Sequence, residues 1–351
     1  MSEGFCVFRP GPQEKIYMYY ERRLTDSFAR LIKKNGILRW LFDYVKQNDE
    51  LDFLVGKNNN KEWISIYRGL SRILSITPYG TKHQYCVDAA TAYKRIAMNK
   101  KLNIYSKSDL THLSARQLNI LIASIKNTPK FNRYYENKKE GFYQNILSRR
   151  YGICGTSSDD FVIVDKEAVI GYKDKREKKK IYGPIRENYK RLQKIISKKN
   201  PSRYGKNIAN KAIGNELDFL ALTKDGSLLI VEYKHGTNTS GIYLSPLQIG
   251  LYYDLFKYFN DNKGLLNKSV FSMLKQKQDI GLIHPGWSVP SKIKRLIPVL
   301  IISEFNKRSR AETQFKEIMD IIKVEQKDRN FLRGIQIYNY TSGFNLAPLN
   351  W

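Results

Sequence analysis

The residues best suited to chemistry stand on both sides of one short loop. Two apolar runs, residues 217–223 and 227–233, are joined by residues 224–226, the last of which is glycine. A three-residue loop of this kind typically joins two antiparallel strands, because glycine readily adopts the left-handed conformation that the turn needs. The pattern therefore predicts a β-hairpin. The charged residues around its open end are Glu216, Asp218, Glu232 and Lys234.

The loop also determines which of these charges face each other. If the turn is centred on Asp225, Asp218 falls opposite Glu232, and Glu216 falls opposite Lys234. Side chains alternate along a strand, so all four share one face of the hairpin. Two carboxylates about 5 Å apart repel by roughly 3 kcal/mol at an effective dielectric near 20. A divalent cation between Asp218 and Glu232 would remove that repulsion.

The neighbouring residues distinguish a metal site from an ordinary surface hairpin. Apolar residues occupy both faces of the two runs, which predicts a strand pair buried on both sides. Buried carboxylates are normally paired or bound to metal. The alternative is a hairpin whose charged end protrudes into water, with Glu216 and Lys234 as a cross-strand ion pair. We favour the metal site because facing carboxylates and two-sided apolar flanks occur together.

These residues resemble the signature of the PD-(D/E)xK nuclease superfamily, which has the restriction-endonuclease-like fold. Asp218 is similar to the metal-binding Asp at the end of the family's second core strand. Glu232 and Lys234 are similar to the (D/E)-x-K of the third strand. The proline that precedes the Asp in the family is Leu217 here. The resemblance covers about the last half of the chain.

The resemblance implies phosphodiester hydrolysis with Mg²⁺ or Mn²⁺. Asp218 and Glu232 would bind the metal, with the carbonyl of Tyr233 as a third ligand. Lys234 would orient or deprotonate the attacking water, or stabilise charge on the phosphate. Glu216 would assist a second metal or only hold Lys234.

Two helices supply further candidates. Family members often carry a Glu on the first core helix, and the helix predicted over 185–197 makes Glu187 that candidate, with a helix-dipole role as the alternative. Gln248 and Tyr252 are similar to the Gln-x-x-x-Tyr helix of the exonuclease-like branch, so Gln248 would position the site or its substrate. The alternative is a capping box in a helix beginning at Ser245, where Gln248 bonds the backbone.

The charge balance indicates a polyanionic partner. The chain of 351 residues has 61 Lys and Arg against 33 Asp and Glu, a net charge of +28. Basic side chains that neutralise phosphates release counterions, so nucleic acid is the expected partner. Residues 198–206 fit a solvated loop or a phosphate-binding track, and we favour the track. The predicted nucleic-acid contacts are Lys178, Lys179, Lys180, Lys198, Lys199, Arg203 and Tyr252.

The expected fold class is α/β, with a mixed sheet of the α+β kind. Residues 1–155 are predicted to form a mostly helical domain that binds nucleic acid or has a regulatory role. Residues 156–351 are predicted to form a PD-(D/E)xK-like nuclease domain, ordered helix, three-stranded meander, helix, strand. Three widely separated cysteines fit a reducing cytoplasm. The chain shows no signal-peptide pattern and no apolar run of membrane-spanning length, so we expect no membrane partner.

We therefore expect a Mg²⁺-dependent nuclease acting on DNA, in restriction, anti-phage defence or mobile-element biology by analogy. RNA cleavage is the alternative within enzymes, because phosphate chemistry does not distinguish the 2′-hydroxyl. The alternative that is not an enzyme is a catalytically silent nucleic-acid-binding protein. The presence of Asp218, Glu232 and Lys234 favours an enzyme. The sequence leaves open whether the protein forms a homodimer or works with a partner subunit or helicase.

Overall fold

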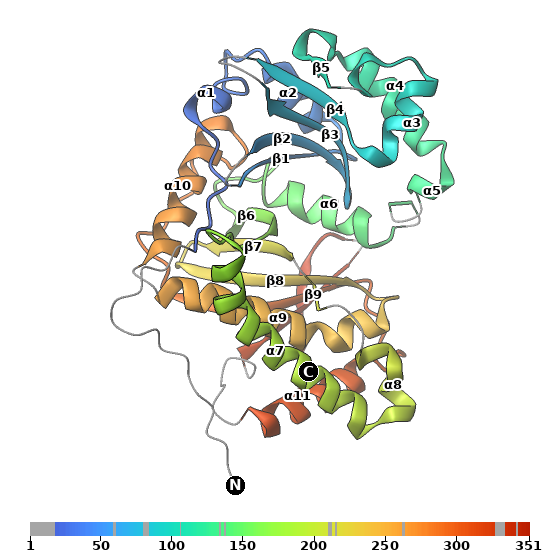
Figure 1. Ribbon diagram of the computed structural model, residues 1–351, viewed down its shortest axis with the longest axis vertical. Helices are drawn as coiled ribbons and strands as arrows, with labels where there is room; N and C mark the ends of the chain where they lie inside the picture. Colours follow the sequence, from blue (N-terminus) through green and yellow to red (C-terminus); the bar gives the residue numbers. More distant parts are fainter. Residues whose placement is uncertain are drawn as a thin grey trace.

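The computed structural model describes residues 18–351, apart from 59–60, 80–83, 106, 133–134, 137, 210–212, 215, 262–263, 327–333 and 342. The chain forms two β-sheets, with helices around and between them (Figure 1). The α/β class with a mixed sheet is confirmed.

The first sheet is antiparallel, in the order β1-β2-β3-β4-β5. Its strands are β1 (Asp52–Lys57), β2 (Glu62–Arg68), β3 (Ser71–Pro78), β4 (Tyr85–Ala89) and β5 (Ser108–Asp109). The helical segments of this part are α1 (Asp26–Ala29), α2 (Arg39–Gln47), α3 (Thr91–Asn99), η1 (Asn103–Tyr105), η2 (Leu110–His112), α4 (Ala115–Lys126) and α5 (Pro129–Asn132). The part predicted to be mostly helical, residues 1–155, therefore also contains a five-stranded sheet. Alternate residues such as Ile64 and Ile66 are buried in the core on one face of this sheet, because side chains alternate along a strand.

The second sheet is mixed, in the order β11-β10-β9-β8-β7-β6. Its strands are β6 (Phe161–Ala168), β7 (Leu217–Thr223), β8 (Ser227–His235), β9 (Arg295–Ser303), β10 (Gln336–Tyr340) and β11 (Leu346–Pro348). β6, β7 and β8 form an antiparallel meander, and β9 then pairs parallel to β8. Its helices are α6 (Glu140–Arg150), α7 (Lys175–Lys199), α8 (Pro201–Ala209), α9 (Thr239–Asp261), α10 (Leu265–Ile280) and α11 (Ala311–Glu325).

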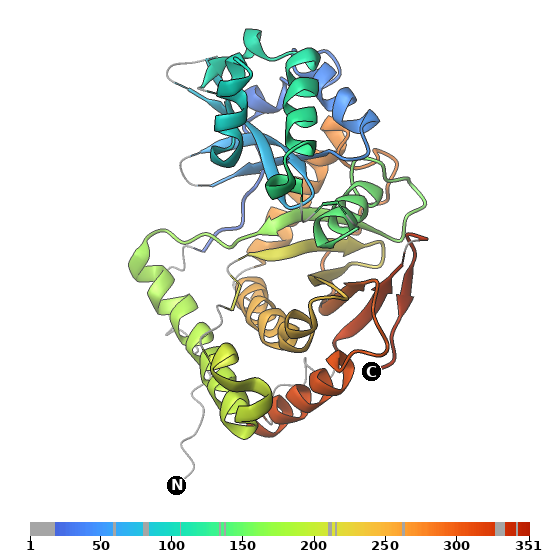
Figure 2. The same ribbon diagram turned by 90° about the vertical axis from the view of Figure 1, so that its right-hand side faces the viewer.

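Alternation along β7 and β8 gives each face of this sheet its own core. On one face, Leu220 and Ile230 belong to a cluster with Phe256 of α9. On the other face, Phe219 and Val231 belong to a cluster with Tyr143 of α6. Figure 2 shows α9 directly beneath the sheet, with α7, α8 and α11 farther out. The strand pair is thus buried on both sides, as predicted.

Helix α6 lies between the two sheets and contacts β1, β2 and β8 (Figure 1). The two halves also exchange segments across the boundary expected at residue 155. Met18 and Tyr20 pack into the core of the second sheet, whereas Ile280 and Leu282 pack into the core of the first. Whether residues 1–155 fold as a domain of their own stays a prediction, but the two cores are interlocked.

The start of α7 differs from the prediction. α7 begins after the cap Asp174, whose side chain accepts from the amide of Glu177 at 2.9 Å, and it continues through Pro184. A buried face that runs from Ile181 to Ile196 continues past the proline. This packing outweighs the cost of about 3 kcal/mol for an interior proline. Residues 198–206 therefore lie at the end of α7 and in α8, not in a loop.

Candidate active site

The hairpin at the centre of the site forms with the predicted register. Phe219 lies opposite Val231 and Leu222 opposite Leu228. Extended by one residue, this register places Asp218 opposite Glu232. Gly226 ends the turn with φ +90°, a conformation that a residue with a Cβ atom rarely adopts. The prediction of the hairpin is confirmed.

The charged end of the hairpin is buried, which is evidence against the solvent-exposed alternative. Glu232 is 2% exposed and Lys234 is 8% exposed. One carboxylate oxygen of Glu232, Oε2, is buried and has no hydrogen-bond partner among the described residues. Leaving a buried charged oxygen unsatisfied is costly, so the site favours a proton or an additional cation there.

The ammonium group of Lys234 lies among three oxygen atoms. It donates to Glu232 Oε1 and to the carbonyl oxygen of Tyr233, the latter at 2.9 Å. It also lies 3.6 Å from Asp218 Oδ2, which accepts from the backbone amide of Tyr233 at 2.7 Å. These three oxygen atoms belong to the residues predicted as metal ligands, and they converge on one point.

A fourth charged side chain, Glu140, reaches the site from α6 and was not predicted. The end of β8 holds the start of this helix in place, because His235 Nε2 donates to the carbonyl of Lys138 at 3.1 Å. Glu140 is partly buried, and burial raises its pKa to about 7. The charge of Lys234 lowers this pKa and that of Asp218 raises it, so all these charges belong to one cluster. A glutamate in a polar stretch gives no sequence signal for such a long-range contact.

The cluster holds three acids, Asp218, Glu232 and Glu140, against one base, Lys234. Burial, reinforced by the charge of Asp218, raises the pKa of Glu232, although Lys234 opposes the shift. Burial alone would lower the pKa of Lys234, but Glu232, Asp218 and Glu140 together outweigh that effect and raise it. Lys234 therefore stays protonated at neutral pH, whereas two of the acids resist ionisation. A second cation would favour the ionised forms of these acids.

Glu216 and Glu187 do not join the cluster. Glu216 is exposed, and its charge acts on Arg22, Tyr67 and Glu167 at the junction of the two halves. The alternative ion pair of Glu216 with Lys234 is not seen among the described residues, where Lys234 pairs with Glu232 and Asp218 instead.

Glu187 is not among the charges that act on Glu232 or Lys234, and its role at the site stays a prediction. It lies exposed on α7 and pairs with Lys190 at 3.0 Å. The helix that precedes the first strand of the meander is α6, and this helix carries Glu140.

The Gln-x-x-x-Tyr pair lies on α9, beneath the start of β7. The predicted helix start at Ser245 is wrong, because α9 begins at Thr239 and the Ser245 hydroxyl donates to the carbonyl of Ile242. Gln248 is therefore an interior residue of the helix, and the capping box does not form. A Cβ atom on Gly214 would lie 2.9 Å from the side-chain nitrogen Nε2 of Gln248. The side chain of Gln248 therefore packs against the segment that leads into β7.

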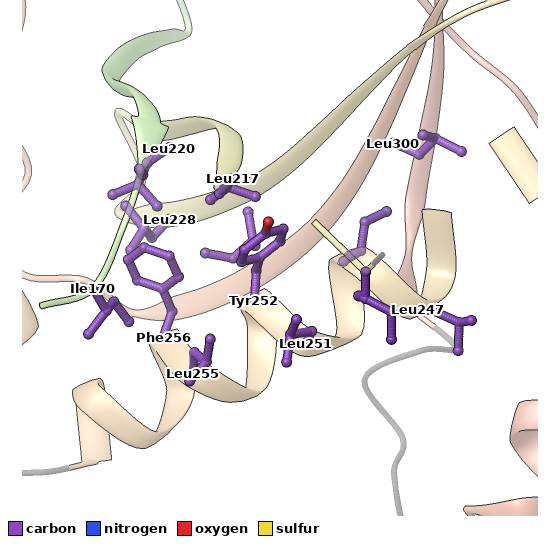
Figure 3. Packing of buried hydrophobic residues seen from close by; sticks show 14 of the residues in the cluster. Ile170, Leu217, Leu220, Leu228, Leu247, Leu251, Tyr252, Leu255, Phe256 and Leu300 are labelled. Atoms are coloured by element: carbon purple, nitrogen blue, oxygen red, sulfur yellow. The ribbon is translucent and has the colours of Figure 1, made fainter. Parts of the chain in front are cut away.

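Tyr252 contributes to the core rather than to a nucleic-acid surface. It is 4% exposed and lies among Leu217, Leu251 and Phe256 (Figure 3). Its hydroxyl donates to the carbonyl of Glu216 at 2.6 Å, which fixes the backbone two residues before Asp218. The predicted contact between Tyr252 and nucleic acid is at odds with this burial.

The predicted phosphate-binding lysines lie at the two ends of α7. The three lysines of the first end and the two of the second are all exposed: Lys178, Lys179, Lys180, Lys198 and Lys199. Arg203 differs, because it pairs with Glu317 of α11 and its charge is already compensated. The lysines stay candidates for nucleic-acid contact, and Arg203 has a structural partner instead.

The donor set of the site suits a magnesium ion. Among the residues that the structure describes, no group of three or more His, Cys, Asp or Glu side chains is arranged to hold a metal. The site instead offers the carboxylates of Asp218 and Glu232 and one backbone carbonyl. Mg²⁺ commonly uses one or two carboxylates, keeps several waters and completes its shell with substrate phosphate. The orphaned Glu232 Oε2 is a further oxygen donor, so the residues fit such an ion.

No family model, curated protein or solved structure matches the chain. None of the described helices is both long and apolar enough to cross a membrane.

Proposed function

We propose that the protein is a metal-dependent nuclease that hydrolyses phosphodiester bonds of DNA with Mg²⁺ or Mn²⁺. One observation carries the proposal: oxygen atoms of Asp218, Glu232 and Tyr233 surround the ammonium group of Lys234 at a largely buried point. A structural ion pair would need only one carboxylate per lysine. Two carboxylates, a third acid nearby and an unsatisfied oxygen favour a site that accepts a divalent cation.

The order of the elements supports a restriction-endonuclease-like core. α6 precedes the meander β6–β7–β8, α9 follows it, and β9 then pairs parallel to β8. This is the order helix, three-stranded meander, helix, strand that the resemblance implies. In this proposal, α7 and α8 are an insertion between the first two strands, and Glu140 takes the place of the helix glutamate.

The protein side chains divide the chemistry among them. A metal ion held by Asp218, Glu232 and the Tyr233 carbonyl would activate a water and polarise the scissile phosphate. Lys234 carries a fixed positive charge that orients the water or stabilises the negative charge developing on the phosphate. Glu140, with a pKa of about 7, exists in both protonation states at neutral pH and can accept a proton there.

The proposal is tested by cleavage assays on supercoiled circular DNA, linear duplex DNA and RNA, each with Mg²⁺, Mn²⁺ or EDTA. We expect DNA to be cut with either metal and to stay intact in EDTA. Preferential cleavage of RNA would show that the substrate is RNA and not DNA. Absence of cleavage of any substrate would favour a binding protein built on the same fold.

A further inference from the structure

A polar pocket opens next to the candidate active site, where β8 and β9 end and two long helices begin. Its volume is about 570 Å³, and the start of α9 and the start of α11 both line it. The carboxyl ends of parallel strands are a common place for ligands in open α/β sheets.

A close backbone contact brings the two helix starts together. The amide of Gly236 donates to the carbonyl of Ser303 at 2.7 Å, so the exit of β8 lies against the exit of β9. A Cβ atom on Gly236 would overlap the carbonyl of Glu304, so only glycine fits there. The position of the pocket is therefore determined by the ends of β8 and β9.

Both helices present their positive ends to the pocket. The side chain of Asn238 caps α9 by accepting from the amide of Gly241 at 2.9 Å. At α11 the side chain of the cap residue, Arg310, forms no capping hydrogen bond. The amides of Glu312 and Thr313 donate to no described acceptor. Helix starts attract anions because their amides are unpaired and the helix dipole adds partial positive charge.

The side chains that line the pocket also suit an anion. Thr237, Thr239, Ser240 and Ser309 bring hydroxyl groups, and none of the described lining residues carries a carboxylate. Arg310 is exposed, and its side chain forms no ion pair or hydrogen bond with the described residues. The acid nearest in sequence, Glu312, is paired with Lys316 at 2.7 Å.

The side chain of Gln314 points most directly to a ligand. Its side chain lines the pocket and is 9% exposed, yet it makes no hydrogen bond with any described residue. Side chains in a helix lean toward its first turn, so this amide is directed at the helix start. Its polar atoms stay open to the pocket, so a ligand with acceptor oxygens can accept a hydrogen bond from its amide.

We infer that this pocket binds a phosphate group of the nucleic acid, beside the phosphate that reacts. The inference rests on the proposed function, because the chain connects the two places directly. Thr237 follows Lys234 by three residues, which spans at most about 10 Å. Successive phosphates advance about 3.4 Å along one strand of a duplex, so the bound phosphate lies within a few nucleotides of the cut. It is either the terminal phosphate of a strand or an internal one.

The test measures binding without metal, so that it does not depend on catalysis. Fluorescent DNA duplexes with a 5′-phosphate or a 5′-hydroxyl are titrated in EDTA against the full chain. Arg310→Ala should weaken binding about tenfold, since it removes a charged hydrogen-bond donor. Gln314→Glu, which keeps the shape but adds a negative charge, should also weaken it. Arg308→Ala is the matched control, because Arg308 is exposed nearby but does not line the pocket.

The two duplexes identify the source of the phosphate. If Arg310→Ala abolishes a wild-type preference for the 5′-phosphate, the pocket binds a strand end. If both duplexes lose affinity equally, it binds an internal phosphate. Equal affinities of Arg310→Ala and Arg308→Ala, or no binding of DNA by the wild type, would overturn the inference. DNA binding that depends on Arg310 but is followed by no cleavage would contradict only the proposed nuclease activity.

Discussion

The carboxylate of Asp218 accepts a hydrogen bond from the backbone amide of Tyr233 at 2.7 Å. This hydrogen bond joins the first acid of the site to the strand that carries the second acid and the lysine. The same oxygen lies 3.6 Å from Lys234 Nζ. The oxygen atoms that would bind a metal are thus positioned by the protein itself, and Lys234 is the cation already among them.

The first prediction concerns the stability of the metal-free protein at different pH values. Glu140 has a pKa of about 7 in the folded protein and an ordinary value of 4.5 when exposed. Between these values the unfolded chain releases its proton while the folded protein keeps it, so the folded state loses stability as pH rises. The loss approaches about 3 kcal/mol by pH 7.5. Glu140→Gln should remove it.

Chemical denaturation in EDTA between pH 4.5 and pH 7.5 measures this effect. The unfolding free energies of wild type and Glu140→Gln should be similar at the low end, and the variant should become the more stable of the two at the high end. A constant difference across the range would show that Glu140 is not held in a buried, charged cluster.

The second prediction separates the two glutamates that could serve as the helix acid. Glu140→Gln should lower the rate of DNA cleavage by about 100-fold, a typical effect of losing a proton-transfer group. Glu187→Ala should leave the rate almost unchanged, because Glu187 lies exposed and pairs only with Lys190. Single-turnover rates with Mg²⁺ measure both. The opposite ranking would restore Glu187 to the site and remove Glu140.

The third prediction concerns the salt dependence of DNA binding. Replacing Lys178, Lys179 and Lys180 by alanine should flatten the slope of log affinity against log salt by up to about 0.9 for each phosphate that these lysines neutralise. A triple replacement of Lys33, Lys34 and Lys100, which are equally exposed, is the control for net charge. Equal changes in both variants would indicate that α7 contributes only general charge and no phosphate-binding track.

The fourth prediction tests the structural role of Tyr252. Tyr252→Phe removes the hydroxyl that donates to the Glu216 carbonyl and should lower the free energy of unfolding by about 1 kcal/mol. DNA affinity in EDTA should not change, because the ring is buried. Thermal unfolding and a binding titration measure the two effects. Weaker DNA binding at unchanged stability would instead support the contact with nucleic acid that the sequence predicted.

Local patterns were sufficient for the hairpin and its register. A loop of three residues leaves one register for the two runs, so the facing of Asp218 and Glu232 followed from counting. The burial of both faces followed from apolar residues at every position between them. Strand β9 likewise coincides with an apolar run, Leu296 to Ile302.

Contacts between distant segments were not predictable in this way. Glu140 reaches the cluster only because α6 packs on the second sheet, and no periodicity indicates which sheet a helix will cover. Pro184 and Pro246 look like helix starts in sequence, yet both lie inside helices whose buried faces continue past them. Tyr252 has the spacing of a functional residue, but its burial depends on the fold of the strand above it.

The central claim is tested most directly by Asp218→Asn, measured for cleavage, DNA affinity and metal-dependent stability together. The amide oxygen of Asn can still accept from the Tyr233 amide, so the fold should be retained. We expect cleavage to fall at least about 100-fold, while DNA affinity in EDTA stays within about twofold, since binding comes from the many basic residues elsewhere. Mg²⁺ and Mn²⁺ should raise the melting temperature of the wild type more than that of the variant.

Lys234→Gln should lose cleavage to a similar degree while remaining folded. The account is contradicted if the wild type cuts neither DNA nor RNA with any divalent metal and its melting temperature does not respond to Mg²⁺ or Mn²⁺.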